Sequence, residues 1–251
     1  MAKLVFIGTG SGGFVGSERQ NPSVYFDGIL FDCGAGTNGR LYDLELLNKV
    51  EVILISHLHS DHISGIYDLL VQIAIDGSLN KTERAIEIFS PPGLSKLITD
   101  YVKTEAISSD LLKFANFKLH ETESLDIKIK GKHIIGVKLD HLAFNLGYPI
   151  DNGKTKVAYS GDTRVPSAIE KLKTDYLIHE ASFPEKHKDL AIKFGHSTAK
   201  DAAKTAVKMG AKRLFLTHLN NRSGPADEIE SEAKEVFKNS IVVNDFNSFE
   251  I

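Results

Sequence analysis

The stretch that decides the fold is Ile53-Leu54-Ile55-Ser56-His57-Leu58-His59-Ser60-Asp61-His62-Ile63. Its apolar start predicts a strand that ends at Ser56, and Ser60 is placed as the N-cap of a following helix. His57 and His59 are two residues apart, which in an extended loop sends both imidazoles to one side. The stretch therefore predicts a strand, a histidine-bearing loop and a helix in succession.

The same stretch predicts a metal site. Asp61 and His62 fall in the first helical turn, from which their side chains can point back toward the end of the strand. Imidazole nitrogens and a carboxylate suit borderline divalent ions such as zinc, manganese and iron. A polar surface loop is the alternative interpretation, but three histidines and an aspartate at these offsets are rare by chance.

Three further candidates each follow an apolar strand pattern. His141 comes after His133–Leu139, Asp162 comes after Lys156–Tyr159, and His218 comes after the run Leu214-Phe215-Leu216-Thr217. Layered α/β folds place their active-site loops at strand ends. Because two-metal hydrolases need ligands beyond one closed set of four, often including a bridging carboxylate, these three residues are the expected additions.

The distribution of short strands and helical patterns predicts an α/β layered fold in which two sheets are covered by helices. No low-complexity linker divides the chain, so we expect a single domain over residues 1–251. The expected strands are Lys3–Ile7, Ser23–Phe26, Ile29–Phe31, Val52–Ile55, Ile86–Phe89, Ile127–Ile129, His133–Leu139, Lys156–Tyr159, Tyr176–Ile178, Leu214–Leu216 and Ile241–Val243. The expected helices are Gly39–Leu47, Ile63–Ile75, Leu94–Val102, Thr198–Met209 and Ala226–Phe237.

Composition narrows the class of protein. The 251 residues carry 30 Lys and Arg against 33 Asp and Glu, a net charge of −3, so no whole-molecule field attracts nucleic acid, although a local basic patch remains possible. The lone Cys33 excludes an intramolecular disulfide and a four-cysteine zinc site, and it is expected to be a small packed residue. No apolar run approaches the roughly 20 residues of a membrane helix, and we expect a cytoplasmic protein.

The ordered set of motifs resembles the metallo-β-lactamase superfamily. The family's first motif, an aspartate after an early strand, is matched by Asp32 in Phe31-Asp32-Cys33-Gly34. The resemblance implies a four-layer αββα sandwich with two divalent metal ions, zinc foremost and manganese or iron as alternatives. It implies that one metal is held by His57, His59 and His141, that the other is held by Asp61, His62 and His218, and that Asp162 bridges them.

Shorter motifs resemble the ribonuclease Z branch, the tRNA 3′-processing endonucleases. Five matches occur in the right order: Ser17-Glu18-Arg19; Leu139-Asp140-His141 with Gly147-Tyr148; His179-Glu180-Ala181-Ser182-Phe183, with serine at the usual threonine; His196-Ser197-Thr198; and Leu216-Thr217-His218-Leu219-Asn220-Asn221-Arg222.

Two features depart from that branch. The typical bacterial enzymes carry a long tRNA-gripping arm between the third and fourth motifs, whereas only one hairpin, around Asp151-Asn152-Gly153, fits between His141 and Asp162 here. The N-terminal loop from Gly8 to Gly16 is glycine-rich and lacks the family's proline pattern. The catalytic core is therefore better supported than tRNA as the substrate.

The resemblance implies a catalytic arrangement. Two metal ions activate a water for attack at phosphorus, and Asp61 orients it or accepts its proton. His196 supplies charge or a proton to the leaving oxygen, and Glu180 holds that imidazole. Arg222 contacts a substrate phosphate. A structural hydrogen-bond network is the alternative interpretation of Glu180, His196 and Arg222. Asp32 and His179 are placed as supporting residues behind the ligands.

We therefore predict a metal-dependent phosphodiesterase resembling ribonuclease Z, acting on RNA or on smaller nucleotide diesters, with a homodimer implied by the resemblance. A hydrolase of lactones, β-lactams or thioesters on the same scaffold is the alternative enzyme. A catalytically silent binding module is the third hypothesis, and the complete ligand set argues against it.

Overall fold

The computed structural model describes residues 2–12, 19–80, 85–104, 108–220 and 222–251. Its strands form two seven-stranded sheets, with the orders β14-β1-β2-β3-β4-β5-β6 and β13-β12-β11-β10-β9-β8-β7. The first contains β1 (Lys3–Gly8), β2 (Ser23–Phe26), β3 (Ile29–Phe31), β4 (Val52–Leu54), β5 (Ile86–Ser90), β6 (Phe117–Glu121) and β14 (Ser248–Glu250). The second contains β7 (Leu125–Ile129), β8 (Lys132–Leu139), β9 (Asn145–Asp151), β10 (Lys156–Tyr159), β11 (Tyr176–Glu180), β12 (Arg213–Thr217) and β13 (Ser240–Val242).

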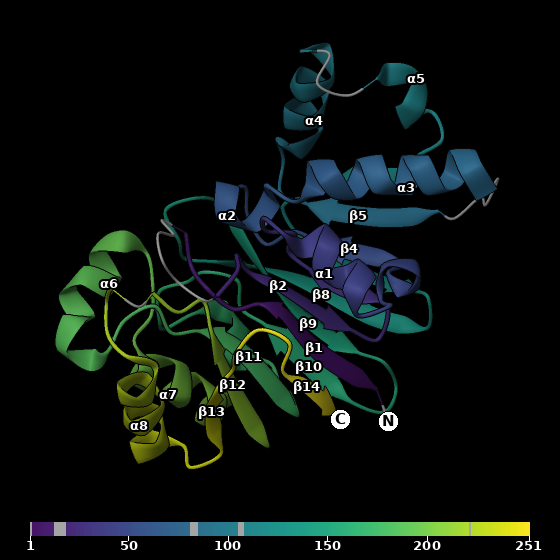
Figure 1. The fold of residues 1–251 in the computed structure, drawn as a ribbon. Helices are drawn as coiled ribbons and strands as arrows, with labels where there is room; N and C mark the ends of the chain where they lie inside the picture. Colours follow the sequence, from purple (N-terminus) through teal and green to yellow (C-terminus); the bar gives the residue numbers. More distant parts are fainter. Residues whose placement is uncertain (1, 13–18, 81–84, 105–107, 221) are drawn as a thin grey trace.

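Helices lie outside both sheets (Figure 1). The first sheet is accompanied by α1 (Thr37–Asp43), α2 (Ser60–Ile63), α3 (Ile66–Asn80), α4 (Leu94–Lys103) and α5 (Ser109–Leu112), with the 3₁₀ turn η1 (Leu47–Lys49). The second sheet is accompanied by α6 (Lys188–Phe194), α7 (Ala199–Met209) and α8 (Ala226–Val236), with the turns η2 (Ala168–Lys171) and η3 (Glu185–His187).

Three apolar layers hold this arrangement together. Phe6 and Phe31 of the first sheet pack with Tyr148 and Phe215 of the second in the layer between the sheets. A second cluster lies between the first sheet and its helices, and a third lies between the other sheet and α7, α8 and η2, where the small alanines of α7 allow close approach. The predicted four-layer αββα sandwich is confirmed.

Three strands of the structure were not predicted: β6, β9 and β14. β9 carries Gly147 and Pro149, residues that weaken a strand pattern. Its pairing with β8 runs from His133↔Asp151 and Ile134↔Ile150 to Val137↔Gly147, so the ladder is interrupted around Pro149, which has no N–H to donate. β9 lies in the stretch of sequence between His141 and Asp162 and forms one strand of the predicted hairpin. The turn of this hairpin contains Gly153 at φ +83°.

The predicted helix Ile63–Ile75 is wrong in its extent, because α2 and α3 are separate helices around Gly65. A Cβ at Gly65 would lie 2.1 Å from the backbone oxygen of Gly34, so the chain turns where only glycine fits. The predicted N-cap Ser60 is also wrong, since His59 is the N-cap and Ser60 begins α2. The predicted helix Gly39–Leu47 is divided between α1 and η1.

The predicted helix Thr198–Met209 is confirmed within one residue: Thr198 caps α7 and Gly210 ends it at φ +69°. Ser17, Glu18 and the part of the glycine-rich loop from Gly13 to Gly16 lie outside the described residues. Within the described ranges, no helix has the length and apolar character that crossing a membrane requires.

Candidate metal centre and active site

The candidate ligands converge at one edge of the sandwich. β9 is antiparallel to both β8 and β10, and β10, β11 and β12 are parallel, so β8, β10, β11 and β12 all end at the same edge of the second sheet. His141, Asp162 and His218 follow three of these strand ends. β4 of the first sheet supplies the remaining candidates through the loop and α2 that follow it.

The seven candidates fall into two groups, and within each group the ligand atoms lie within 4.8 Å of one another. One group is His57, His59, His141 and Asp162, and the other is Asp61, His62 and His218.

Asp162 lies between the groups. Its Oδ2 is 3.3 Å from Nε2 of His218, 3.5 Å from Nε2 of His62, 3.7 Å from Nε2 of His57 and 3.9 Å from Nε2 of His141. One carboxylate thus faces imidazoles of both groups, which is the position a bridging ligand requires.

The chemistry of the cluster fits divalent metal ions. Nε2 of His57 and Oδ1 of Asp162 are buried and have no hydrogen-bond partner among the described residues, a costly arrangement unless something else binds them. Burial lowers the pKa of His57, His59 and His141, so these imidazoles keep the lone pair that a metal requires.

The carboxylates of the cluster are held ionised. Burial alone would raise the pKa of Asp162, but the neighbouring histidines, first His218 and then His62, lower it well below the ordinary value. Burial would likewise raise the pKa of Asp61, but the hydrogen bond to His218 and the charge of His62 lower it. Nitrogen and oxygen donors of this kind match the predicted zinc, manganese or iron.

Asp32 holds the cluster from behind. It follows β3 in a left-handed conformation at φ +54° and is completely buried. Its carboxylate accepts hydrogen bonds from Ser56 N at 2.7 Å, Ser56 Oγ at 2.8 Å, Tyr159 OH at 2.6 Å and His62 Nδ1 at 2.7 Å. With Nδ1 engaged, Nε2 of His62 is directed toward the other ligands.

Two serine hydroxyls hold further imidazoles in matching ways. Ser56 Oγ lies 3.0 Å from Nδ1 of His57 and donates to Asp32. Ser182 Oγ lies 2.9 Å from Nδ1 of His218 and donates to Glu180 at 2.7 Å. Each hydroxyl therefore accepts from an imidazole and donates to a buried carboxylate, which fixes the tautomer that leaves Nε2 for a metal.

His141 is fixed by backbone. Its Nδ1 donates to the carbonyl oxygen of Gly195 at 2.7 Å, and its Nε2 lies 3.3 Å from Nδ1 of His59. A Cβ at Gly195 would be 2.8 Å from that Nδ1, and Gly195 has φ +83°, so both space and conformation require glycine here.

His196 forms a pair with Glu180 beside the cluster. Nδ1 of His196 is 3.1 Å from Oε1 of Glu180 and 3.8 Å from Oδ2 of Asp162. Burial would lower the pKa of His196, but the Glu180 carboxylate outweighs it and raises the pKa to about 9. His196, Asp162 and His218 also have ligand atoms within 4.8 Å of one another, so His196 directly adjoins the cluster.

Glu180 is itself fixed in place. It is buried, and its Oε1 accepts from Thr163 N at 2.8 Å while Oε2 accepts from Ser182 Oγ. Burial would raise the pKa of Glu180, but the charge of His196 lowers it. The carboxylate is therefore ionised and oriented toward the imidazole.

Two predicted residues lie outside this arrangement. Arg222 is exposed in the turn after β12, where its backbone N–H donates to Oδ1 of Asn220 at 3.0 Å. His179 is buried in β11, and its Nδ1 donates to the backbone oxygen of Glu180 at 2.8 Å. Since neighbouring strand residues face opposite ways, His179 is directed away from the cluster that Glu180 faces.

Sequence reasoning assigned no role to Ser56, Tyr159, Ser182 or Gly195. Ser56 and Ser182 lie inside the quoted motifs, and Gly195 directly precedes one of them. Their closeness in sequence to the predicted ligands is therefore the signal that could have indicated them. The partnership of Tyr159 with Asp32 joins residues 127 positions apart, and no local pattern indicates it.

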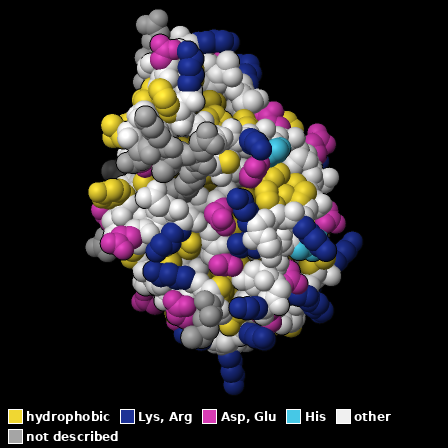
Figure 2. Space-filling model, turned by 90° about the vertical axis from the view of Figure 1, so that its right-hand side faces the viewer, with side chains coloured by type: hydrophobic (Ala, Val, Ile, Leu, Met, Phe, Trp, Pro, Cys, Tyr) yellow, Lys and Arg dark blue, Asp and Glu magenta, His cyan; other side chains and the backbone are white. Residues whose placement is uncertain are grey.

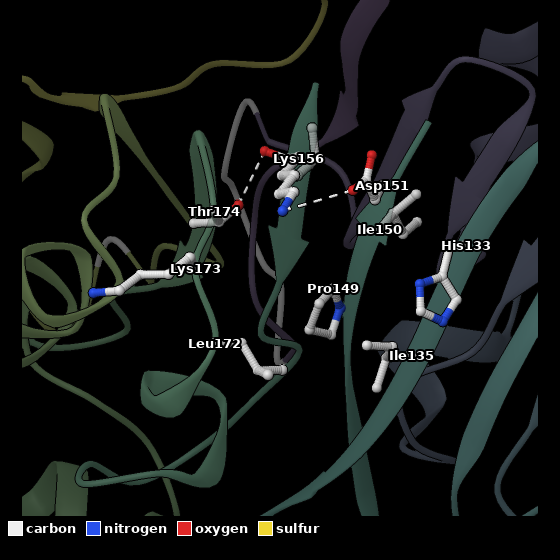
Figure 3. A pocket seen from close by; sticks show the side chains of 10 residues that line it. His133, Ile135, Pro149, Ile150, Asp151, Lys156, Leu172, Lys173 and Thr174 are labelled. Carbon is white, nitrogen blue, oxygen red and sulfur yellow. Dashed lines mark hydrogen bonds and ion pairs between the residues drawn. The ribbon is translucent and has the colours of Figure 1, made fainter. Parts of the chain in front are cut away.

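A cavity of about 470 Å³ lies beside the metal centre, lined by residues 138–144 with His141 among them. Another, of about 190 Å³, lies toward the other end of the second sheet (Figure 3). Some of its polar side chains are already engaged with neighbours: Nζ of Lys156 is 3.7 Å from Oδ2 of Asp151, and Oγ1 of Thr174 donates to the backbone oxygen of Lys156. Of these two cavities, only the one lined by residues 138–144 includes a candidate metal ligand, His141.

The comparisons with known proteins agree with this geometry. The model of the beta-lactamase superfamily domain matches residues 28–219. A ribonuclease Z of Archaeoglobus fulgidus is 31% identical, aligned over 99% of this chain and 97% of the relative. The structure of the human short-form tRNase Z, ELAC1, superimposes with a TM-score of 0.80 at 26% identity, covering 99% of each chain. The metallo-beta-lactamase fold protein YhfI of Bacillus subtilis has a TM-score of 0.83 at 23% identity, covering 100% of this chain and 99% of the other, which supports the fold alone.

Fold and site thus define a hydrolase scaffold with a histidine- and aspartate-rich metal centre. The chain belongs to the beta-lactamase superfamily and, within it, to the ribonuclease Z family. The alignment with the archaeal relative runs over 310 positions, more than the 251 residues of this chain, so the relative contains residues that have no counterpart here.

Proposed function

We propose that this protein is a dinuclear metal-dependent phosphodiesterase of the ribonuclease Z kind that cleaves phosphodiester bonds in RNA. The observation that carries the proposal is the position of the His196–Glu180 pair beside the cluster, with Nδ1 of His196 3.8 Å from Oδ2 of Asp162. A metal site next to a protonated imidazole suits a reaction in which an oxygen leaves an anionic phosphorus centre.

The seven cluster residues hold the metals in this proposal. His57, His59 and His141 would hold one ion, Asp61, His62 and His218 would hold the other, and Asp162 lies within reach of both sets of imidazoles. When bound, two such ions lower the pKa of a water and stabilise the charge of an in-line displacement at phosphorus. Zinc is the first choice, with manganese and iron as the alternatives that the donor set permits.

The protein's own groups manage the protons. Asp61 is ionised and stands at the rim of the cluster, with Oδ2 3.4 Å from Nε2 of His218, so it orients the attacking water or accepts its proton. Glu180 keeps Nδ1 of His196 protonated, which leaves the opposite nitrogen to donate to the leaving oxygen. Arg222, exposed at the end of β12, contacts a phosphate of the bound strand.

Features of the chain outside the metal cluster narrow the range of substrates. Between His141 and Asp162 the chain forms only β9, a tight turn and β10, so no arm extends from this position. The lack of an arm there favours short RNA ends or small nucleotide diesters over a substrate gripped far from the metals. On the face shown in Figure 2, which lies away from α2 and α6, basic and acidic side chains are interspersed, so the described part of that face offers no extended basic surface to a long RNA.

A substrate panel tests the proposal. We expect turnover of an aryl phosphodiester and of a pre-tRNA 3′ end by the metal-loaded protein, and none of a lactone. Cleavage of the aryl diester without the pre-tRNA would restrict the substrate to small diesters. Turnover of the lactone alone would replace the proposal by a hydrolase of carbonyl substrates.

Three related expectations belong to the same proposal. The chain acts as one catalytic domain over residues 1–251, it works in the cytoplasm, and it forms a homodimer. Sedimentation of the purified protein tests the last of these, since a monomer at micromolar concentration would contradict it.

A further inference from the structure

We propose that Asp245, which lies just before β14 and outside every motif of the site, is a positioning residue for one half of the metal centre. The inference rests on the metal centre proposed above. It starts from a carboxylate that is almost fully buried in a segment linking the two sheets. Val243 N donates to Leu216 O of β12 at 3.1 Å, and Phe246 N donates to Phe6 O of β1 at 2.7 Å. Figure 1 shows the chain end beside β1.

The Asp245 carboxylate binds two stretches of chain that are far apart in the sequence. Its Oδ1 accepts from Thr9 N at 2.9 Å and from Thr9 Oγ1 at 2.7 Å, and its Oδ2 accepts from Gln20 N at 2.7 Å. Thr9 and Gln20 are joined again through Gly10 N, which donates to Gln20 O at 2.8 Å. One side chain thus fixes both described ends of the segment between residues 9 and 20.

Two arginines, Arg40 and Arg19, add to the contacts that Asp245 makes. Arg40 donates to Asp245 Oδ2 and to Ile7 O, and its guanidinium lies over the ring of Phe246 at 4.4 Å. Arg19 donates to Thr9 Oγ1 at 2.7 Å and to Val243 O at 2.5 Å. Charge-assisted bonds of this kind are stronger than neutral ones, so Ile7, Thr9 and Arg19 are held firmly against the chain end.

The anchored segment contacts Asp61 and the residue that follows His218. Leu219 N donates to Thr9 O and Ser11 N donates to Leu219 O, both at 3.0 Å, so residues 9 and 11 enclose the residue after His218. His218 has a left-handed backbone at φ +58°, which the surrounding bonds must maintain. Gly12 faces Asp61, since a Cβ at Gly12 would lie 2.9 Å from its Oδ2.

Asp61 and His218 both belong to the group Asp61, His62 and His218. The other group is fixed from different elements, through Ser56 for His57 and through Gly195 for His141. Loosening Asp245 therefore weakens one metal position and spares the other. A residue that merely stabilised the fold would affect both positions alike.

The test is a titration of the metal-free full-length protein with Co²⁺, followed by visible absorption and by competition with a chelator. We compare the unmodified chain with Asp245→Asn and with the control Asp175→Asn. Asp175 also accepts a backbone bond, from Lys156 N at 2.8 Å, and pairs with Lys212 at 2.8 Å, but it lies at the opposite end of the second sheet. His218→Ala removes one candidate ligand and serves as the reference for a chain that has lost one of its two metal positions.

We expect two equivalents in the unmodified chain and in Asp175→Asn. In Asp245→Asn one equivalent should bind as before and the other about tenfold or more weakly, the usual effect of removing a group behind a ligand, with the spectrum of the remaining ion matching that of His218→Ala. Unchanged binding of both equivalents, or equal weakening of both, would overturn the inference.

A milder variant, Thr9→Val, tests the inference if Asp245→Asn fails to fold. It removes the hydroxyl that donates to Asp245 and leaves the backbone bond. We again expect one metal equivalent to bind more weakly and the other to bind as before. If the unmodified chain binds no Co²⁺, the metal centre itself is wrong. If it binds two equivalents and both Asp245→Asn and Thr9→Val bind them equally well, only the role of Asp245 is wrong.

Discussion

Asp32 and His62 are joined directly behind the candidate metal centre, with Oδ2 of Asp32 2.7 Å from Nδ1 of His62 and both side chains completely buried. Burial would lower the pKa of His62, but the carboxylates of Asp162 and Asp32 raise it well above the ordinary value. The pair connects the end of β3 to α2 and turns Nε2 of His62 toward the other ligands. It ties the fold of the first sheet to the geometry of the metal centre.

Replacing Asp32 should therefore damage both stability and metal binding. Asparagine tolerates the left-handed conformation at φ +54°, so Asp32→Asn removes the charge with little backbone cost. We expect the free energy of unfolding to fall by about 3 kcal/mol and metal affinity to fall by about 10- to 100-fold. Denaturant unfolding and metal titration measure these, with Asp151→Asn in the β9–β10 hairpin as the control. Wild-type affinity in Asp32→Asn would contradict the role.

Gly195 offers a matched pair of substitutions. Gly195→Ala and Gly153→Ala both place alanine at φ +83°, but a Cβ at Gly153 meets nothing within 4 Å, whereas one at Gly195 lies 2.8 Å from Nδ1 of His141. Both variants should lose about 1 kcal/mol of unfolding free energy for the backbone conformation. Only Gly195→Ala should also weaken metal binding. Equal metal affinity in the two variants would show that His141 is not held from Gly195.

The His196–Glu180 pair should act on turnover and not on the metals. His196→Ala removes the proton donor, and we expect kcat for an aryl phosphodiester to fall by about 10²- to 10⁴-fold with two metal ions retained. Glu180→Gln keeps the shape but not the charge and should lower kcat in the same direction. Loss of metal from His196→Ala would instead make this residue a ligand.

Cys33 should be inert in the native protein. Its thiol is completely buried, and burial together with the charge of Asp32 raises its pKa far above the ordinary value. The reactive thiolate is therefore absent at neutral pH. An aromatic disulfide reagent should label no thiol in the folded chain and one thiol per chain after denaturation. Rapid labelling before unfolding would show that the region around Asp32 opens readily.

Periodicity and local turn chemistry predicted much of the fold. The segments Ser23–Phe26, Ile29–Phe31 and Lys156–Tyr159 have the predicted bounds, because each is a short apolar run with polar or glycine neighbours. β9 was missed because Pro149 and Gly147 break the pattern of a strand whose place is set by pairing on both sides. The helix around Gly65 was predicted as continuous because its interruption depends on a contact with Gly34, far away in the sequence.

The candidate site was likewise predicted only in part from the sequence. Its seven metal-ligand candidates are visible in sequence because each follows a strand that ends at a common edge. The residues behind them are less visible, since they act through partners distant along the chain: Tyr159 binds Asp32, Ser182 links His218 to Glu180, and Asp245 binds Thr9. No local spacing encodes such contacts.

Metal content tests the central claim most directly. The protein is purified without added chelator, and the bound ions are counted by elemental analysis before and after dialysis against a strong chelator, with phosphodiesterase activity measured at each stage. The account predicts close to two divalent ions per chain, loss of activity when they are removed, and recovery when they are restored. A natively folded chain that carries no metal and still hydrolyses the diester would contradict it.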